Sequence, residues 1–330
     1  MDTTQEARTV AGHTLTPGTR TEMELRPAKL PSGGWMSIPV VALHGTRPGP
    51  TVWLSAAIHG DEICGVEIIR QVLAPLRPRE MAGTLLAVPV VNVPGFANGD
   101  RYMPDRRDLN RSFPGSKRGS LASRFAHAFM SEIVQLCDVG IDLHTGSDHR
   151  RNVPQIRADL TDARTAELTR VFAAPYALHS RLRDGSLREA ACSRGATALL
   201  YEAGEAWRFE RDAIEVGVRG VRRVLSHLGV TSPDAASADV VPTTILGSSS
   251  WVRSPQSGLA RLDVELGDTV TERQTIGVVA DAIGTTQRPI RAPRAGVVIG
   301  RNESPVVHRG DALVHIAEHN AAEHSAGESA

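Results

Sequence analysis

The clearest pattern along the chain is an apolar run that gives way to an amphipathic segment. Residues 51–58 are almost wholly apolar, which is typical of a strand buried in a sheet. Residues 62–73 carry apolar side chains at helical spacing, and the pattern stops before Pro75, as a helix does. The polar residues between the two segments therefore lie where a strand leaves the sheet. This is the edge at which open α/β sheets place their functional sites.

Strands and helices continue to alternate beyond this point. The alternation predicts an α/β fold with a mixed, largely parallel sheet and helices on both faces. Residues 10–45 read instead as short strands with Pro and Gly turns, so we expect an N-terminal β ribbon at the edge of the sheet. Further strands are expected at 85–91, 139–141 and 198–200, and further helices at 121–136, 161–172, 185–194 and 209–228.

The pattern changes after residue 230. Residues 231–239 are rich in Ser, Ala, Asp and Pro, which is typical of a linker. Short β segments with glycine turns follow, and residues 264–270 are echoed by 306–313. This unit resembles the barrel-sandwich fold of biotinyl and lipoyl carrier domains. Those carriers present a modified lysine, and this chain has none after Lys117, so carrier chemistry is excluded.

We therefore expect an α/β domain over residues 1–238, a β barrel-sandwich-like domain over 239–317 and a disordered tail over 318–330. A small β unit placed after a complete α/β domain is expected to cap a pocket or to join subunits into a homo-oligomer. The tail is rich in Ala, Glu, His and Ser.

Composition narrows the class of protein. The 330 residues carry 37 Lys and Arg against 37 Asp and Glu, so there is no basic field for nucleic acid. The 3 cysteines have no paired spacing, which fits buried thiols in a reducing compartment. The N-terminus has no apolar core segment, and no apolar stretch is long enough to span a membrane. We expect a cytoplasmic protein that binds neither membrane nor nucleic acid.

Three residues at predicted strand ends supply the ligands of a catalytic zinc site. His59 and Glu62 follow the strand at 51–58, and His144 follows the strand at 139–141. Two histidines and one glutamate hold zinc and leave one coordination position open for water. The alternative is that His59 caps the following helix and Glu62 favours its first turn. Asp142 lies two residues before His144, so it can orient that ligand from the same face of the strand.

A long polar loop, residues 94–117, follows the strand at 85–91 and has almost no expected secondary structure. Such loops in compact domains are usually functional. This one carries Arg101, Arg107, Asn110 and Arg111. An arginine binds a carboxylate through two parallel hydrogen bonds, so Arg111 is a candidate anchor for an acidic substrate. A surface arginine in a basic run is the alternative.

Amide hydrolysis at zinc also requires a carboxylate that takes a proton from water and passes it to the leaving amine. Glu202 and Glu205 both qualify by type. Glu202 follows the apolar run 198–200, so we expect it at a strand end. Glu205 is expected to begin a helix before Trp207 or to line the substrate pocket.

These motifs resemble the succinylglutamate desuccinylase/aspartoacylase family of the zinc carboxypeptidase clan, over about residues 52–316. The resemblance implies a zinc carboxypeptidase-like fold and one Zn²⁺ per chain on His59, Glu62 and His144. It implies that Glu202 is the catalytic carboxylate. It also implies roles for three residues of the long loop: Asn110 and Arg111 would bind the substrate carboxylate, and Arg101 would lie near the oxyanion. Arg107 competes for that last role, because the spacing from Arg101 to Asn110 is two residues longer in this chain than in aspartoacylase.

The function expected from these residues is a zinc-dependent amidohydrolase that removes an acyl group from an N-acylated amino acid or a related small amine. Water activated by zinc would attack the amide carbonyl. Two alternatives stay open at this point. One is a zinc carboxypeptidase acting on short peptides, and the other is a non-catalytic binding protein on the same scaffold.

Overall fold

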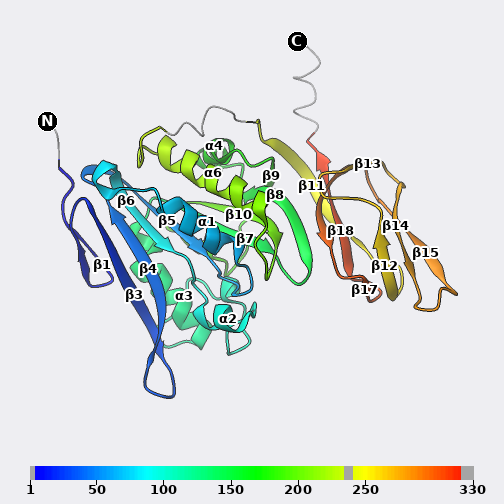
Figure 1. The fold of residues 1–330 in the computed structure, drawn as a ribbon, viewed down its shortest axis with the longest axis horizontal. Helices are drawn as coiled ribbons and strands as arrows, with labels where there is room; N and C mark the ends of the chain where they lie inside the picture. The colour runs from blue at the N-terminus through cyan, green and yellow to red at the C-terminus, as the bar shows by residue number, and fades with distance from the viewer. Residues whose placement is uncertain (1–3, 234–240, 321–330) are drawn as a thin grey trace, which may run out of the picture.

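The computed structural model describes residues 4–233 and 241–320. A twelve-stranded mixed sheet runs through the molecule (Figure 1). The strand order is β13-β16-β18-β11-β9-β8-β10-β7-β5-β6-β4-β3. These strands are β3 (Thr19–Lys29), β4 (Trp35–His44), β5 (Arg47–Ala56), β6 (Ala82–Val88), β7 (Val139–Gly146), β8 (Arg150–Ala158), β9 (Tyr176–His179), β10 (Thr197–Glu205), β11 (Thr244–Arg253), β13 (Thr269–Val270), β16 (Gly296–Asn302) and β18 (Ala312–His319).

Parallel pairing is concentrated near the centre of this sheet. The pairs β10–β7, β7–β5, β5–β6, β8–β9 and β9–β11 are parallel. The other pairs, including β8–β10 and all those at the two edges, are antiparallel. The expected mixed sheet is therefore present, but the expectation that it is largely parallel is wrong, because antiparallel pairs outnumber parallel ones among the described strands.

Helices cover both faces of the sheet. Neighbouring residues of the central strands point to opposite sides, so each strand contributes side chains to an apolar core on either face. Val52 and Leu54 pack in one core with α1 (Cys64–Leu73), α4 (Ala163–Phe172) and α6 (Arg211–His227). Trp53 packs in a second core with α3 (Leu121–Glu132) and α5 (Leu187–Cys192).

The long loop at residues 94–117 has more secondary structure than expected. It contains the short helix α2 (Val93–Asn98) and the 3₁₀ turn η2 (Leu109–Arg111). Asn92 caps α2 through a hydrogen bond from Gly95 N, and Asp108 caps η2 through one from Asn110 N. These turns are stabilised by polar capping side chains. They therefore show no apolar periodicity in the sequence by which they could have been predicted. Two further 3₁₀ turns are η1 (Pro78–Glu80) and η3 (Val134–Leu136).

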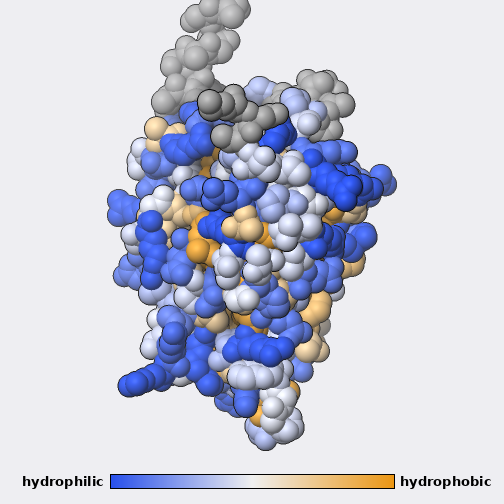
Figure 2. Space-filling model, turned by 90° about the vertical axis from the view of Figure 1, so that its left-hand side faces the viewer, coloured by the Kyte–Doolittle hydropathy of each residue, from blue (hydrophilic) through white to orange (hydrophobic). Residues whose placement is uncertain are grey.

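The N-terminal ribbon lies at one edge of the sheet, where β3 pairs with β4 (Figure 1). Its outer face carries charged side chains, among them the ion pairs Arg20–Glu22 and Arg26–Glu24. Figure 2 shows this side of the molecule, where hydrophilic residues surround small scattered hydrophobic areas. Charged residues on an edge strand oppose edge-to-edge aggregation. The small sheet β1 (Arg8–Val10) and β2 (His13–Leu15) precedes β3.

The C-terminal β domain, residues 241–320, continues the main sheet. Strand β11 pairs with β9, and β16 pairs with β8. A separate four-stranded sheet lies beyond them, and both sheets enclose a third apolar core. The strands of the four-stranded sheet are β12 (Gly258–Leu262), β14 (Thr275–Ala280), β15 (Gln287–Arg291) and β17 (Val306–Val307).

Two predicted segments fall wholly or partly outside the described residues. Most of the expected linker, 231–239, and most of the expected tail, 318–330, lie there. Residues 318 and 319 belong to β18. Among the helices of the described residues, none has the length and apolar character needed to cross a membrane.

Candidate metal centre and active site

The turn between β5 and α1 presents two of the predicted metal ligands. Glu62 N donates to His59 O at 3.1 Å, which closes a tight turn before the helix. A Cβ on Gly60 would lie 2.0 Å from the backbone carbon of Gly95, so only glycine allows this turn to pack against α2. Ile63, not His59, occupies the N-cap of α1. The capping alternative for His59 is therefore wrong.

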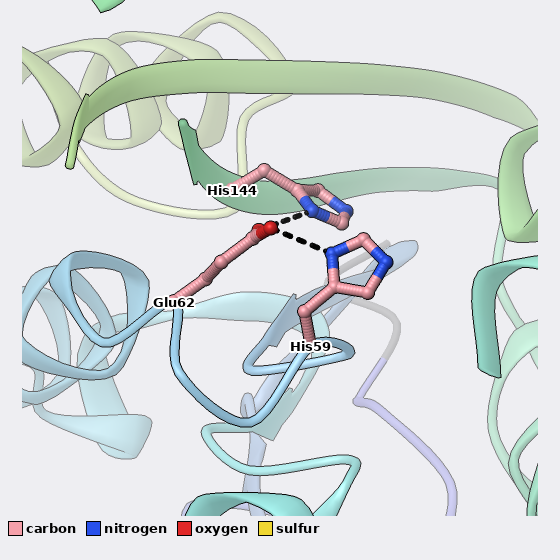
Figure 3. A group of neighbouring side chains, drawn as sticks. All are labelled: His59, Glu62 and His144. Atoms are coloured by element: carbon pink, nitrogen blue, oxygen red, sulfur yellow. Dashed lines mark hydrogen bonds and ion pairs between the residues drawn. The ribbon is translucent and has the colours of Figure 1, made fainter. Parts of the chain in front are cut away.

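His144, near the end of β7, completes the cluster (Figure 3). Glu62 lies between the two imidazoles, with its two carboxylate oxygens 2.7 Å from His59 Nδ1 and 2.7 Å from His144 Nδ1. All three side chains are buried, and one donor atom from each lies within 4.8 Å of the others. Two imidazole nitrogens and one carboxylate fit a three-ligand zinc site with an open position.

Two further carboxylates hold the imidazoles from behind. His59 Nε2 lies 3.1 Å from Asp108 Oδ1, and His144 Nε2 lies 2.7 Å from Asp142 Oδ2. Ser55 Oγ donates to the other oxygen of Asp142 at 2.7 Å. A proton on each Nε2 leaves each Nδ1 free as a ligand, which is how carboxylates orient metal-binding histidines. The expected orienting role of Asp142 matches this geometry.

Charge complementarity outweighs burial in this cluster. Burial acts to raise the pKa of Glu62, yet His59 and His144 hold it well below its ordinary value. Burial acts to lower the pKa of His59, but Glu62 and Asp108 raise it overall. Glu62 is therefore kept as a carboxylate, the form in which it binds a cation.

A cavity of about 290 Å³ opens beside the cluster and gathers all seven predicted site residues. Its volume lies near the lower end of the range for small-molecule sites. Six arginines but only three acids line it, so the wall is strongly cationic. The predicted lining residues are His59, Glu62, Arg101, Asn110, Arg111, His144 and Glu202. The remaining charged ones are Asp142, Arg157, Arg181, Arg183 and Arg188.

Of the two arginines that competed for one role, Arg101 lies in the site. Its Nη1 donates to Glu62 Oε1 at 3.0 Å, and its Nη2 donates to Asp108 Oδ2 at 3.3 Å. Arg107 has a side chain that is 64% exposed and lies 3.9 Å from Asp105. Arg101 is therefore next to the candidate metal, while Arg107 is on the outside of the loop.

Asn110 and Arg111 lie side by side at the wall of the cavity, in η2. Asn110 Oδ1 accepts from Leu187 N at 2.9 Å, so this side chain also fixes the first turn of α5. Arg111 is exposed and donates from Nη1 to the carbonyl of Asn110. Its guanidinium therefore lies at the rim, where a carboxylate from solvent can reach it.

Glu202 and Glu205 both belong to β10, which runs past Glu202 rather than ending there. Glu202 lines the cavity. Glu205 is buried at the end of the strand, 3.3 Å from Arg208 and 3.8 Å from His149, and is not among the residues that line the cavity. Both expectations for Glu205 are therefore wrong. It does not begin a helix, because α6 begins only at Arg211, and it does not line the cavity.

Several cavity residues were not singled out from the sequence. Arg157 on β8 and Arg181, Arg183 and Arg188 after β9 carry most of the positive charge. In the sequence they are single arginines among many, without a motif. Only the antiparallel pairing of β8 with β10 brings Arg157 beside Glu202.

Comparisons with known proteins agree with the fold. The family model for the succinylglutamate desuccinylase/aspartoacylase catalytic domain matches residues 48–228. The N-alpha-acetyl-L-2,4-diaminobutyric acid deacetylase of Halomonas elongata is 31% identical over 297 residues, 86% of each chain. A succinylglutamate desuccinylase/aspartoacylase structure from Rhodobacter sphaeroides is 28% identical with a TM-score of 0.84, covering 92% of this chain and 96% of that one.

The product-bound structure of the ectoine utilization protein EutE (DoeB) from Ruegeria pomeroyi is 26% identical with a TM-score of 0.83. It covers 95% of this chain and 98% of that chain, so the likeness includes the C-terminal β domain. The family match spans more than half of the chain and contains every residue of the candidate metal centre. This chain belongs to the succinylglutamate desuccinylase/aspartoacylase family.

Proposed function

We propose that this chain is a zinc-dependent amidohydrolase that removes an acyl group from a small N-acylated amino acid. One observation carries the proposal. A single cavity holds the His59–Glu62–His144 set together with a further carboxylate, Glu202, and several arginines. These are the parts that metal-assisted amide hydrolysis of an acidic substrate requires. The named activities of the relatives, a deacetylase and a desuccinylase, belong to the same reaction class.

His59, Glu62 and His144 would hold the metal, and Asp108 and Asp142 would fix the two imidazoles. Zinc supplies a Lewis acid that lowers the pKa of water to about 7 and polarises the acyl carbonyl. Burial of all three donor side chains excludes bulk water from the ligand set. A metal held by these three side chains would be reached by substrate only from the cavity.

Substrate orientation falls to the cationic wall. Arg111 lies at the rim and would bind the carboxylate of the amino acid through its planar fork. Arg101 lies deeper, where its Nη1 donates to Glu62 Oε1 at 3.0 Å, and it would face the acyl oxygen on which negative charge develops. The substrate would therefore span from the rim to the metal, with its amide bond in front of Glu202.

Glu202 would act first as a base and then as an acid. It takes one proton from the attacking water, and the new C–O bond forms at the acyl carbon. It then gives that proton to the nitrogen as the C–N bond breaks, which releases a free carboxylic acid and an amine.

The test is amine release from a panel of N-acyl amino acids and dipeptides, with zinc content measured in parallel. Glu202→Gln should keep zinc and the fold but lose ~10²–10⁴-fold in kcat. Glu205→Gln is the matched control on the same strand and should retain most activity. His59→Ala should lose both zinc and turnover. Release from dipeptides alone, or a larger loss in Glu205→Gln than in Glu202→Gln, would contradict the proposal.

A further inference from the structure

Asn152 occupies a buried position between the α/β domain and the C-terminal β domain. It lies on β8, opposite Gly204 of β10 on one side and Gly300 of β16 on the other. Its side chain belongs to a residue that is only 4% exposed and that is not among those lining the cavity. A buried amide in such a place is kept for a hydrogen bond rather than for solubility.

The partner of that amide is the proposed catalytic carboxylate. Asn152 Nδ2 donates to Glu202 Oε1 at 2.7 Å. Arg157, also on β8, forms an ion pair from Nε to Glu202 Oε2 at 2.8 Å. The two oxygens of Glu202 are thus held by two residues of one neighbouring strand. A glutamate held at both oxygens has lost most of its rotamer freedom before substrate arrives.

The C-terminal β domain provides the space for this arrangement. A Cβ on Gly300 would lie 2.7 Å from Asn152 Oδ1, 3.1 Å from His315 Cβ and 3.2 Å from the ring of Trp251. The latter two contacts form a packed wall on β18 and β11. The amide of Asn152 therefore fits only because residue 300 has no side chain.

We propose that Asn152 is a positioning residue for Glu202, and that β16 leaves room for its amide at Gly300, so the C-terminal β domain contributes to the arrangement of the active site. The inference rests on the proposed role of Glu202. Asn152 itself touches neither the cavity nor the metal ligands. It acts by aiming one oxygen of Glu202, while Gly300 of the domain behind it leaves the space that the amide occupies.

The main test replaces the amide by groups of the same shape. Asn152→Leu removes the donor, and Asn152→Asp replaces it by a carboxylate that repels Glu202 when ionised. Both should lower kcat by about 10–100-fold with little change in KM, the range expected for a lost hydrogen bond to a charged group. Only Asn152→Asp should recover relative to wild type as the pH falls, because the introduced carboxyl regains a proton to donate. A residue that merely supports the fold would show no such pH-dependent difference between the two variants.

A second test acts from the C-terminal β domain. Gly300→Ala should displace the amide of Asn152 and lower kcat in the same way. Gly247→Ala on β11 is the matched control, since its added Cβ would find no atom closer than 3.5 Å. Zinc content and circular dichroism are measured for every variant.

The outcomes separate this inference from the proposed function. Wild-type kcat in both Asn152 variants, or equal pH profiles for the two, would overturn the positioning role. So would loss of zinc or of folded structure in both, because Asn152 would then be a structural residue. An equal kcat in Gly300→Ala and Gly247→Ala would show that the C-terminal β domain has no part in positioning Glu202. If the wild-type chain releases no amine from any substrate, the proposed function is wrong and the inference falls with it.

Discussion

The carboxylate of Asp142 lies 2.7 Å from Nε2 of His144, two residues further along the same strand. Alternate residues of a strand point to the same face, so β7 itself brings the two side chains together. Asp142 is also fixed by Ser55 on the neighbouring parallel strand β5. The orientation of one proposed metal ligand therefore depends on the register of two central strands.

Asp142→Asn should weaken zinc binding without abolishing it. The amide cannot enforce a proton on Nε2 as a carboxylate does, so the His144 imidazole is free to present the wrong nitrogen. Loss of such a partner typically lowers metal affinity by about 10–100-fold. Competition with a chromophoric chelator measures this. Asp148→Asn, on the exposed loop after β7, is the control and should bind zinc like the wild type. Equal affinities would show that Asp142 does not orient His144.

Much of the candidate metal centre was predictable because its residues follow local strand and turn patterns. His59 and His144 each come after an apolar run, and the structure places both near the ends of adjacent parallel strands. Local pattern and tertiary position agree here, since the carboxyl ends of parallel strands meet at one edge of a sheet. Arg101 could be separated from Arg107 only by the structure, because both lie in one irregular loop.

The supports of Glu202 were not predictable for a physical reason. Asn152 and Arg157 reach it across an antiparallel pair, and nothing in the sequence gives the register of that pair. The continuation of the main sheet into β11 and β16 was missed in the same way. A change of period at residue 231 indicates a new unit but says nothing about the edge with which its strands pair.

Arg111→Lys should weaken substrate binding and leave the chemical step nearly intact. Lysine keeps the charge but loses the two parallel hydrogen bonds. Hydrogen bonds to charged groups contribute about 1.5–3 kcal/mol, and the exposure of Arg111 favours the lower end, a rise in KM of about tenfold. Steady-state kinetics on a carboxylate-bearing substrate measure it, with Arg107→Lys as the control outside the cavity. An unchanged KM would exclude Arg111 from substrate binding.

The charge of the cavity predicts which amino-acid side chains are accepted. Its three acids are already engaged: Glu62 with both ligand histidines, Asp142 with His144, and Glu202 with Arg157. No lining acid is therefore left for a cationic side chain, while six arginines line the cavity.

We expect kcat/KM for acetyl-aspartate or acetyl-glutamate to exceed that for acetyl-diaminobutyrate by at least about tenfold, roughly 1.4 kcal/mol. The difference should shrink as salt is added, because ions screen partly exposed charges. Competition between the substrates in one reaction measures the ratio directly. A preference for the diaminobutyrate derivative would mean that an acid outside the cavity lining reaches the substrate.

Finally, His315 should make folding stability depend on pH. It is buried on β18, stacked on Trp251 at 4.7 Å between ring centroids, with Nε2 3.0 Å from Ser249 Oγ. Burial, with a smaller effect from Arg157, lowers its pKa to about 3.

The unfolded chain takes up a proton on this residue below its ordinary pKa of about 6.5, while the folded chain does so only near pH 3. The stability that neutral His315 contributes is therefore complete above about pH 6.5 and is lost as the pH falls, at up to about 1.4 kcal/mol per pH unit.

Urea unfolding of wild type and His315→Gln at several pH values isolates this contribution, because all other groups titrate in both proteins. From pH 6.5 to pH 5 the wild type should lose about 1.6 kcal/mol more than His315→Gln. His308→Gln, exposed in the same domain, should follow the wild type. Parallel curves for wild type and His315→Gln would show that this imidazole is protonated, or solvated, in the folded protein.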